Sequence, residues 1–364
     1  MNGDSQHSVV YHDPNRWAAV PANNGGNGPT WQWGDELLVG FTVGQFSAAE
    51  PGHQCSYKHP FASWLARSTD GGESWVAWYP TPYAGQALPV SVPPGGLDFS
   101  QPGFVMRVEG NGYHGNAGAQ WYCSLDRGTD WCGPFGFGDL LEQPEMAGLE
   151  FTGRTAYLVD GPQGLLLFGS VRHRPASGEL NVVSDKPFLA RSDDGGSTFR
   201  FAAWIVDRND PYRAVMPAPV RMPDGTLVVA LRRKSDTHNW IDCHVSRDDG
   251  ASWEPLSRVG DTEAGNRFNG NPPALIRLSD GRLCCAYGDR TACRIVARVS
   301  RDGGGSWGPA QVVRDGFESV NGWPDLGYCR LFERTDGRVV VAYFWCTPER
   351  PQTHIAATIF DVSE

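Results

Sequence analysis

The chain has 364 residues, of which 40% are hydrophobic, so enough apolar side chains are present to bury a sizeable core. Its formal net charge of −10 argues against a nucleic-acid partner, because binding to phosphates requires a basic surface. The chain contains 45 Gly, 27 Pro and 14 Trp and lacks long stretches with the helical hydrophobic period, which favours many short strands joined by turns.

Targeting and metal signals are weak. No run of about 18 apolar residues is present, so we expect no membrane span. The start, MNGDSQHSVV, lacks the features of a signal peptide, and the nine cysteines form no CxxC pair, so we expect a cytoplasmic location with mostly buried thiols. Removal of a leader would instead imply a secreted or periplasmic protein, and Cys123 and Cys132 could pair in an oxidising compartment. The segment from His53 to His59 matches no common zinc spacing, so we expect neither a metal nor a cofactor.

The first predicted elements are two strands and a buried strand. A strand near Ser8 is followed by a turn at Asp13-Pro14 and a second strand that begins near Arg16. The segment ELLVGFTVG, within 31–46, has the continuous apolar character of a fully buried strand. Residues 47–63 are polar and indicate a loop.

Five copies of the pattern Ser-x-Asp-x-Gly-x-x-Trp/Phe follow along the chain. They span 68–75, 124–131, 192–199, 246–253 and 300–307. The Asp can hydrogen-bond its own backbone and the Gly tolerates positive φ, so each copy predicts a tight turn. The aromatic residue lies at a fixed distance from that turn, so each repeat can pack on its neighbour in the same way.

The second half also contains regularly spaced hairpin turns. Asp-Gly pairs begin at Asp224, Asp280 and Asp336, and each is 56 residues from the next. Each unit therefore contains four strands, which is the composition of a propeller blade.

Five boxed units and a sixth unit from Asp325 onward predict an all-β fold. We expect a six-bladed β-propeller with four-stranded antiparallel blades and five boxes, forming a single domain over residues 1–364. The segment around Val9-Val10-Tyr11 is free to complete the last blade, which would close the ring and hide its edges.

The inner strands of a propeller converge on one end of its channel. The arginines that fall near those strand starts or in the adjoining strands and loops include Arg16, Arg107, Arg154, Arg213, Arg232, Arg233, Arg290 and Arg330. Several arginines at one concave place would bind a carboxylate through paired hydrogen bonds. Any single one could instead form a surface or inter-blade ion pair.

With these repeats, the chain resembles the sialidase superfamily of six-bladed propellers, in which the repeats are called Asp boxes. The resemblance implies three arginines that hold a substrate carboxylate, a tyrosine nucleophile assisted by a glutamate, and an aspartate acid/base. It assigns Arg16, Arg232 and Arg290 to the carboxylate clamp. It assigns Tyr328, which opens the last unit, as the nucleophile.

Two members of that expected set do not match. Met216 lies where the glutamate is expected, and no Asp occurs between Asp35 and Asp70. Asp325 could be the base for Tyr328 or a substrate contact, and His53 or Glu50 could be the acid, with a purely structural loop as the alternative. The remaining candidate substrate contacts are Arg154, Arg213, Arg330 and Asn271.

The favoured hypothesis is an exo-acting glycoside hydrolase that releases a terminal acidic sugar, sialic-acid-like or uronic. One alternative is a polysaccharide lyase or another propeller enzyme that uses His with Tyr or Arg. Another is a carbohydrate-binding propeller without catalysis. Aromatic residues such as Trp17 and Trp323 could stack on sugar faces or belong to blade cores. The oligomeric state stays open.

Overall fold

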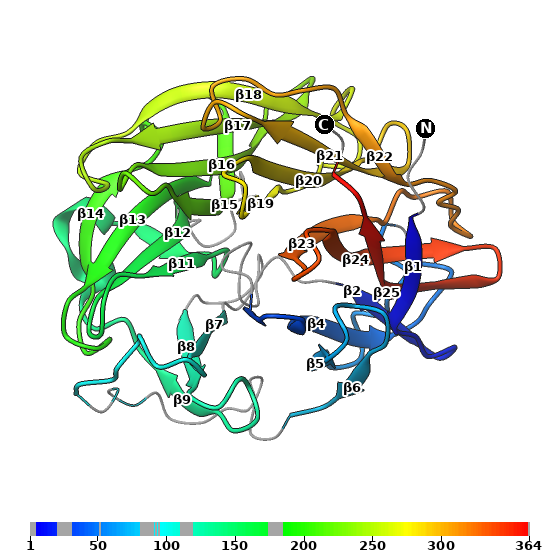
Figure 1. Ribbon diagram of the computed structural model, residues 1–364, viewed down its shortest axis with the longest axis horizontal. Helices are drawn as coiled ribbons and strands as arrows, with labels where there is room; N and C mark the ends of the chain where they lie inside the picture. The colour runs from blue at the N-terminus through cyan, green and yellow to red at the C-terminus, as the bar shows by residue number, and fades with distance from the viewer. Residues whose placement is uncertain are drawn as a thin grey trace.

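The computed structural model describes residues 5–19, 31–50, 52–80, 91, 93, 95–109, 119–173 and 185–362. Within these ranges it contains 25 strands and two short 3-10 helices, η1 (Leu140–Glu142) and η2 (Pro144–Met146). Neither helix approaches the length that a membrane crossing requires. The strands form six antiparallel sheets around a central axis (Figure 1).

We number the six sheets as blades 1 to 6 in the order of their inner strands. Blade 1 contains β2 (Arg16–Ala19), β3 (Trp31–Trp33), β4 (Glu36–Gln45), β5 (Ala62–Ser68) and β6 (Val76–Trp78); blade 2 contains β7 (Val105–Glu109), β8 (Gln120–Ser124) and β9 (Cys132–Phe135). Blade 3 contains β10 (Leu149–Phe151), β11 (Ala156–Val159), β12 (Leu165–His173), β13 (Lys186–Ser192) and β14 (Arg200–Trp204).

The second half of the chain forms three regular four-stranded blades. Blade 4 contains β15 (Arg213–Arg221), β16 (Leu227–Lys234), β17 (Asn239–Ser246) and β18 (Glu254–Glu263); blade 5 contains β19 (Ala274–Arg277), β20 (Leu283–Asp289), β21 (Arg294–Ser300) and β22 (Gln311–Arg314). Blade 6 contains β23 (Gly327–Glu333), β24 (Val339–Thr347), β25 (Arg350–Phe360) and β1 (Gln6–Tyr11).

The predicted six-bladed all-β propeller is therefore confirmed, with three blades that differ in strand number. Blade 2 has three strands within the described ranges. In blades 1 and 3 the innermost position is shared by two short strands, β2 with β3 and β10 with β11, which pair with different parts of one long neighbour. The inner edge is thus interrupted halfway in both blades.

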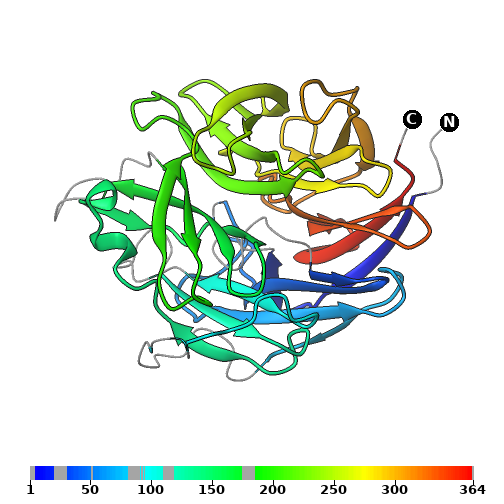
Figure 2. The ribbon, with the colours of Figure 1, turned by 60° about the vertical axis from the view of Figure 1, so that its left-hand side comes forward.

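The N-terminal strand closes the ring, as predicted. Strand β1 pairs with β25 from Gln6 opposite Ile359 to Tyr11 opposite Ile355. His7 Nδ1 adds a side-chain hydrogen bond of 2.9 Å to Thr358 Oγ1. The two ends of the chain consequently lie side by side (Figures 1 and 2).

A separate hydrophobic cluster lies between each pair of neighbouring blades. For example, Leu37 and Val39 of blade 1 pack with Phe332 and Val340 of blade 6, next to Val10 of β1. Five further clusters join blades 1 and 2, 2 and 3, 3 and 4, 4 and 5, and 5 and 6. Burial of apolar surface thus holds the ring together at all six contacts between blades.

The five Asp boxes have one shared hydrogen-bond pattern. In the fifth box, the Ser300 hydroxyl donates to Asp302 Oδ1 at 2.8 Å and accepts from the Gly304 N–H at 2.8 Å. The same two bonds occur in the other four boxes at 2.6–2.9 Å. Side-chain and backbone hydrogen bonds from Ser306 lower the pKa of Asp302 to about 2. Each box is therefore a locally satisfied turn between the last two strands of a blade that follow one another in the sequence.

The inner strands of blades 4 and 6 contain matching irregularities. The register shifts between Val215 and Ala218 in β15, and between Gly327 and Arg330 in β23. Met216 and Tyr328 occupy these shifts with φ values of 60° and 49°. A β-bulge redirects a side chain that would otherwise follow the alternation of the strand, so the side chains of Met216 and Tyr328 depart from the regular alternation of β15 and β23.

Candidate active site

Asp325 is the buried carboxylate of the candidate site. It is fully buried just before β23, and its side chain contacts blades 1 and 6. His53 Nδ1 lies 2.7 Å from Oδ1, while Trp17 Nε1 and Thr353 Oγ1 donate to Oδ2 at 3.2 and 3.4 Å. Burial alone would raise the pKa of this carboxyl, but the neighbouring His53 and Arg290 charges and the hydrogen bonds lower it. Asp325 is thus held as a carboxylate.

His53 is the titratable partner of Asp325. Its Nδ1 is occupied by that carboxylate, so Nε2, on the opposite edge of the ring, is the nitrogen available for another group. The Asp325 charge raises the pKa of His53 above 6.5 and outweighs the opposing effect of its partial burial. The side chain is 39% exposed, so a protonated imidazole at this position is also accessible from solvent.

Tyr328 presents a phenol with an altered acidity. Its hydroxyl accepts a hydrogen bond of 3.4 Å from Arg232 Nη1, and its ring packs against Phe344. Burial raises its pKa, but the charges of Arg232, Arg290, His53 and Arg154 outweigh burial and lower the value to about 8. The phenolate is therefore stabilised by surrounding cations.

The expected carboxylate base is missing from the described surroundings of Tyr328. Met216 occupies the corresponding position in blade 4, and its sulfur lies 3.8 Å from Arg232 Nη1. In the part of the chain that the structure describes, no carboxylate is hydrogen-bonded to the Tyr328 hydroxyl. Asp325 is hydrogen-bonded to His53 instead, so no described hydrogen bond supports Asp325 as the direct base for Tyr328.

Three buried arginines surround Tyr328. Arg232 lies near the end of β16, Arg290 follows β20, and Arg154 lies between β10 and β11. Arg290 is only 4% exposed, and its Nη1 donates to the Phe268 carbonyl oxygen. Its Nε and Nη2 have no hydrogen-bond partner within the described ranges. Two buried nitrogen donors are thus left for acceptors that the described protein does not provide.

Three further candidate arginines have other positions. Arg16 is exposed at the start of β2, whereas its neighbour Trp17 points inward to Asp325, because successive side chains of a strand face opposite sides. Arg213 forms an ion pair with buried Asp185, which also lies 3.8 Å from Arg154. Arg330 donates to the Cys329 carbonyl oxygen at 2.9 Å.

Asn271 and Glu50 make contacts within the protein, and their predicted roles stay predictions. The fully buried Asn271 amide donates to the Leu326 carbonyl oxygen at 2.9 Å and accepts from the Tyr328 N–H at 2.9 Å. Its polar atoms thus hold the backbone on both sides of Gly327, where an added Cβ would lie 2.1 Å from Asn271 Oδ1. Glu50 is half-buried in the loop after β4, and its carbonyl oxygen accepts from Asn321.

Two contacts of Asp325, Trp17 and Thr353, are not predicted from the sequence. The sequence indicates Trp17 only as a possible sugar contact or core residue, and it gives Thr353 no role. Trp17 could have been found because it follows Arg16 on a short strand, where one of the two neighbours must face inward. Nothing local marks Thr353, because it meets Asp325 only through the pairing of β24 and β25.

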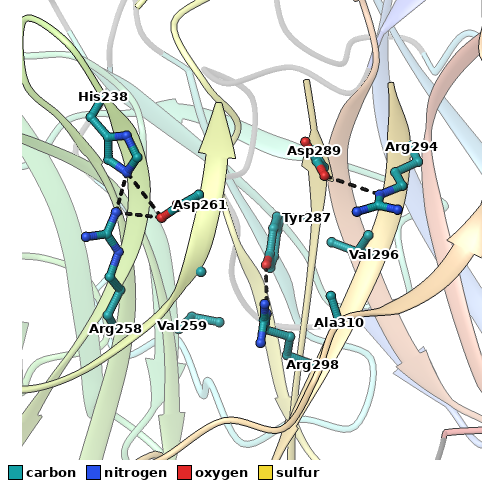
Figure 3. A pocket seen from close by; sticks show the side chains of 11 residues that line it. His238, Arg258, Val259, Asp261, Tyr287, Asp289, Arg294, Val296, Arg298 and Ala310 are labelled. Carbon is teal, nitrogen blue, oxygen red and sulfur yellow. Dashed lines mark hydrogen bonds and ion pairs between the residues drawn. The ribbon is translucent and has the colours of Figure 1, made fainter. Parts of the chain in front are cut away.

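A separate groove lies between blades 4 and 5. It has a volume of about 620 Å³ and is bordered by β18, β20 and β21 (Figure 3). Its charged side chains already have partners: Arg258 pairs with Asp261, Arg294 pairs with Asp289, and Arg298 donates a hydrogen bond to the Tyr287 hydroxyl. The described residues contain no group of three or more His, Cys, Asp or Glu side chains that could hold a metal ion.

Comparisons with known proteins agree with the fold. The sequence profile described as "BNR repeat-like domain" matches residues 104–342. A Dyadobacter fermentans protein of unknown function is similar in structure, with a TM-score of 0.68, 20% identity and coverage of 99% of both chains. The comparison with curated protein sequences finds no match.

Two similar structures are named as enzymes. The Penicillium chrysogenum α-L-arabinanase solved with arabinobiose has a TM-score of 0.56 at 13% identity, covering 99% of this chain and 98% of that one. The Hadza microbial sialidase Hz136 has a TM-score of 0.60 at 17% identity, covering 95% of this chain and 66% of that one. The fold is thus one that glycoside hydrolases of different specificity share.

Proposed function

The chain belongs to the family of BNR repeat-like domains, and from this premise and its arginine-lined site we propose that it is an exo-acting glycoside hydrolase for a terminal acidic sugar. The observation that carries the proposal is Arg290, which is buried with two nitrogen donors, Nε and Nη2, that lack described partners. A substrate carboxylate would supply those acceptors, and Arg232 and Arg154 would add to the local positive charge. Because the chain as a whole has a net charge of −10, this local concentration of cations does not follow from a generally basic surface and favours a site for an anion.

Tyr328 is the proposed nucleophile. A phenol near its usual pKa of about 10 is a weak nucleophile at neutral pH. Here the surrounding cations lower the pKa of Tyr328 to about 8. They thereby favour the nucleophilic phenolate, which an adjacent carboxylate base would otherwise help to form. The Tyr328 oxygen attacks the anomeric carbon, a C–O bond forms to the enzyme, and the bond to the leaving oxygen breaks.

His53 is the proposed acid and base. Protonated His53 gives its Nε2 proton to the leaving oxygen while Asp325 holds Nδ1 and stabilises the imidazolium. In the second step neutral His53 accepts a proton from water. The water oxygen then attacks the anomeric carbon, and the bond to Tyr328 breaks with return of the phenolate.

The proposal is tested with 4-methylumbelliferyl glycosides of N-acetylneuraminic, glucuronic and galacturonic acids, with the α-L-arabinofuranoside as the neutral comparison. We expect release from an acidic glycoside, and loss of that release in Tyr328→Phe while substrate binding persists. The mass of the trapped sugar–enzyme adduct should map to Tyr328. Full turnover by Tyr328→Phe, or cleavage of the neutral arabinoside alone, would contradict the proposal.

A lyase is the second candidate, favoured by the lack of a described carboxylate at the Tyr328 hydroxyl. In that reaction His53 would remove the proton next to a uronate carboxylate, the leaving C–O bond would break as a C=C bond forms, and Tyr328 would protonate the leaving oxygen. The arginines would neutralise the carboxylate. A product with the ultraviolet absorbance of a conjugated double bond, and without incorporation of solvent oxygen, would identify this reaction.

A further inference from the structure

A row of aromatic rings runs from the molecular surface to His53. Tyr57 contacts Phe61 with ring centroids 5.8 Å apart, and Phe61 contacts Trp17 at 6.0 Å. Trp17 in turn lies 5.8 Å from the His53 ring and donates to Asp325. We call Tyr57, Phe61 and Trp17 the aromatic row.

The outer members of the aromatic row are exposed. Tyr57 is 65% exposed and Phe61 is 40% exposed, and both belong to the connection between β4 and β5. Adjacent exposed apolar side chains often mark a ligand-binding surface. Only Trp17, the innermost member, is buried.

Each exposed ring packs on a neighbour. Tyr57 packs on Phe61 with the two rings at 65° to each other. Phe61 lies over Gly44, where an added Cβ would come within 2.6 Å of its ring. The sequence thus leaves space on β4 for a ring that remains partly open to solvent.

The position of His53 decides which part of a substrate would meet this surface. In the proposed reaction its Nε2 protonates the leaving oxygen, so the leaving group must lie beside His53. The acidic sugar lies on the other side of the broken bond, with Tyr328 and the arginines. Because Trp17 lies 5.8 Å from the His53 ring and Tyr57 and Phe61 are exposed, a sugar chain that extends outward from a leaving group beside His53 could reach the aromatic row.

We propose that the aromatic row binds the neutral sugar residues of the leaving group. The apolar C–H faces of pyranose rings fit flat aromatic surfaces, which provide a large contact area with few rotatable bonds. This inference rests on the proposed hydrolase, because it uses His53 to define the leaving-group side. It adds a preference for acidic sugars attached to a neutral oligosaccharide.

The first test compares two substrates with the same acidic sugar: the α-methyl glycoside of N-acetylneuraminic acid and 3′-sialyllactose. Tyr57→Ala and Phe61→Ala should raise the KM for 3′-sialyllactose on the order of tenfold, equivalent to about 1.4 kcal/mol, and leave that for the methyl glycoside unchanged. Tyr57→Phe keeps the ring and is the matched control. Tyr79→Ala removes another exposed aromatic ring, which packs on Trp64.

The second test does not require turnover. Saturation-transfer NMR with lactose should show transfer from the wild-type protein, and Tyr57→Ala/Phe61→Ala should lose it while keeping the wild-type Tm. If neither acidic glycoside reacts, the proposed substrate is wrong, and lactose binding still tests the proposal for the aromatic row. Equal effects of the variants on both acidic substrates, or no binding of lactose to the wild type, would overturn the inference.

Discussion

His53 Nδ1 lies 2.7 Å from Asp325 Oδ1, and this contact joins the loop after β4 to the residue that precedes the inner strand of blade 6. The two residues are 272 positions apart, so only the closed ring brings them together. Each raises the stability of the other's charged form: the pKa of His53 is raised and that of Asp325 is lowered.

Asp325→Asn should lower the pKa of His53, because the largest cause of its raised value is removed. NMR titration of the imidazole measures this directly. A raised histidine pKa contributes stability below the unfolded value of 6.5 and loses it as pH rises through the folded value, so the stability advantage of wild type over Asp325→Asn should shrink over that interval. An unchanged imidazole pKa would contradict the pairing.

Tyr328 should ionise with a midpoint at about pH 8, followed by ultraviolet difference absorbance against Tyr328→Phe. Arg232→Gln should move that midpoint upward toward 10, because it removes the largest cation contribution. Activity should then rise across the same interval as the phenolate forms. Arg221→Gln, which changes an ion pair with Asp160, is the control that should leave the midpoint in place.

Asn271→Ala should disturb Tyr328 without touching its phenol. The amide holds the Leu326 carbonyl and the Tyr328 N–H, so its loss leaves two buried backbone groups unpaired at about 1–3 kcal/mol each. We expect a lower kcat with little change in KM, together with a shifted midpoint for Tyr328 ionisation. A variant that loses stability but keeps the wild-type midpoint would show a purely structural role.

Ser300→Ala should destabilise the fold by about 1–3 kcal/mol, because the buried Gly304 N–H loses its acceptor. Ser306→Ala removes an exposed hydroxyl from the same box and should have the smaller effect. Denaturant unfolding compares the two. Neither variant should shift the Tyr328 midpoint, which makes Ser300→Ala the stability-matched control for Asn271→Ala.

Cys132 should be the fastest of the nine thiols to react with an aromatic disulfide reagent in the native protein. It is the exposed member of the set, while Cys293 is half-buried and the other seven are buried. Burial raises the pKa of Cys123, directly opposite Cys132 in the β8–β9 pair, to about 12. Cys132→Ser should abolish the fast phase, and several equally fast thiols would contradict this arrangement.

The fold could be predicted largely because its signals are local. An Asp box makes its hydrogen bonds within five residues, so the pattern around Ser300 is readable without knowing its neighbours. The segment around Val10 belonged to no other predicted unit, so it could be assigned as the missing strand of the last blade. The shared inner strands β2 with β3 and β10 with β11 were not predicted, because they depend on how a long neighbour distributes its pairing.

The candidate site was less predictable because its contacts cross the ring. Arg232, Arg290 and Tyr328 could be placed near one another by their positions within repeated units, and their roles stay predictions. The sequence could not decide between Arg16 and Trp17 as the inward residue, since a shift of one position reverses the face of a strand. It also could not show that the Asn271 amide is occupied by backbone groups 55 and 57 positions away.

The pairing of β1 with β25 has a consequence for biosynthesis. Strand β1 finds its partner only after a long further stretch of chain has been made, because His7 and Thr358 are 351 positions apart. Until then, one edge of β1 and the apolar side of Val10 stay uncovered, a state prone to pairing with other chains. Nascent chains should therefore depend on chaperones until blade 6 is synthesised, and slow translation of the codons for blade 6 should lower the soluble yield.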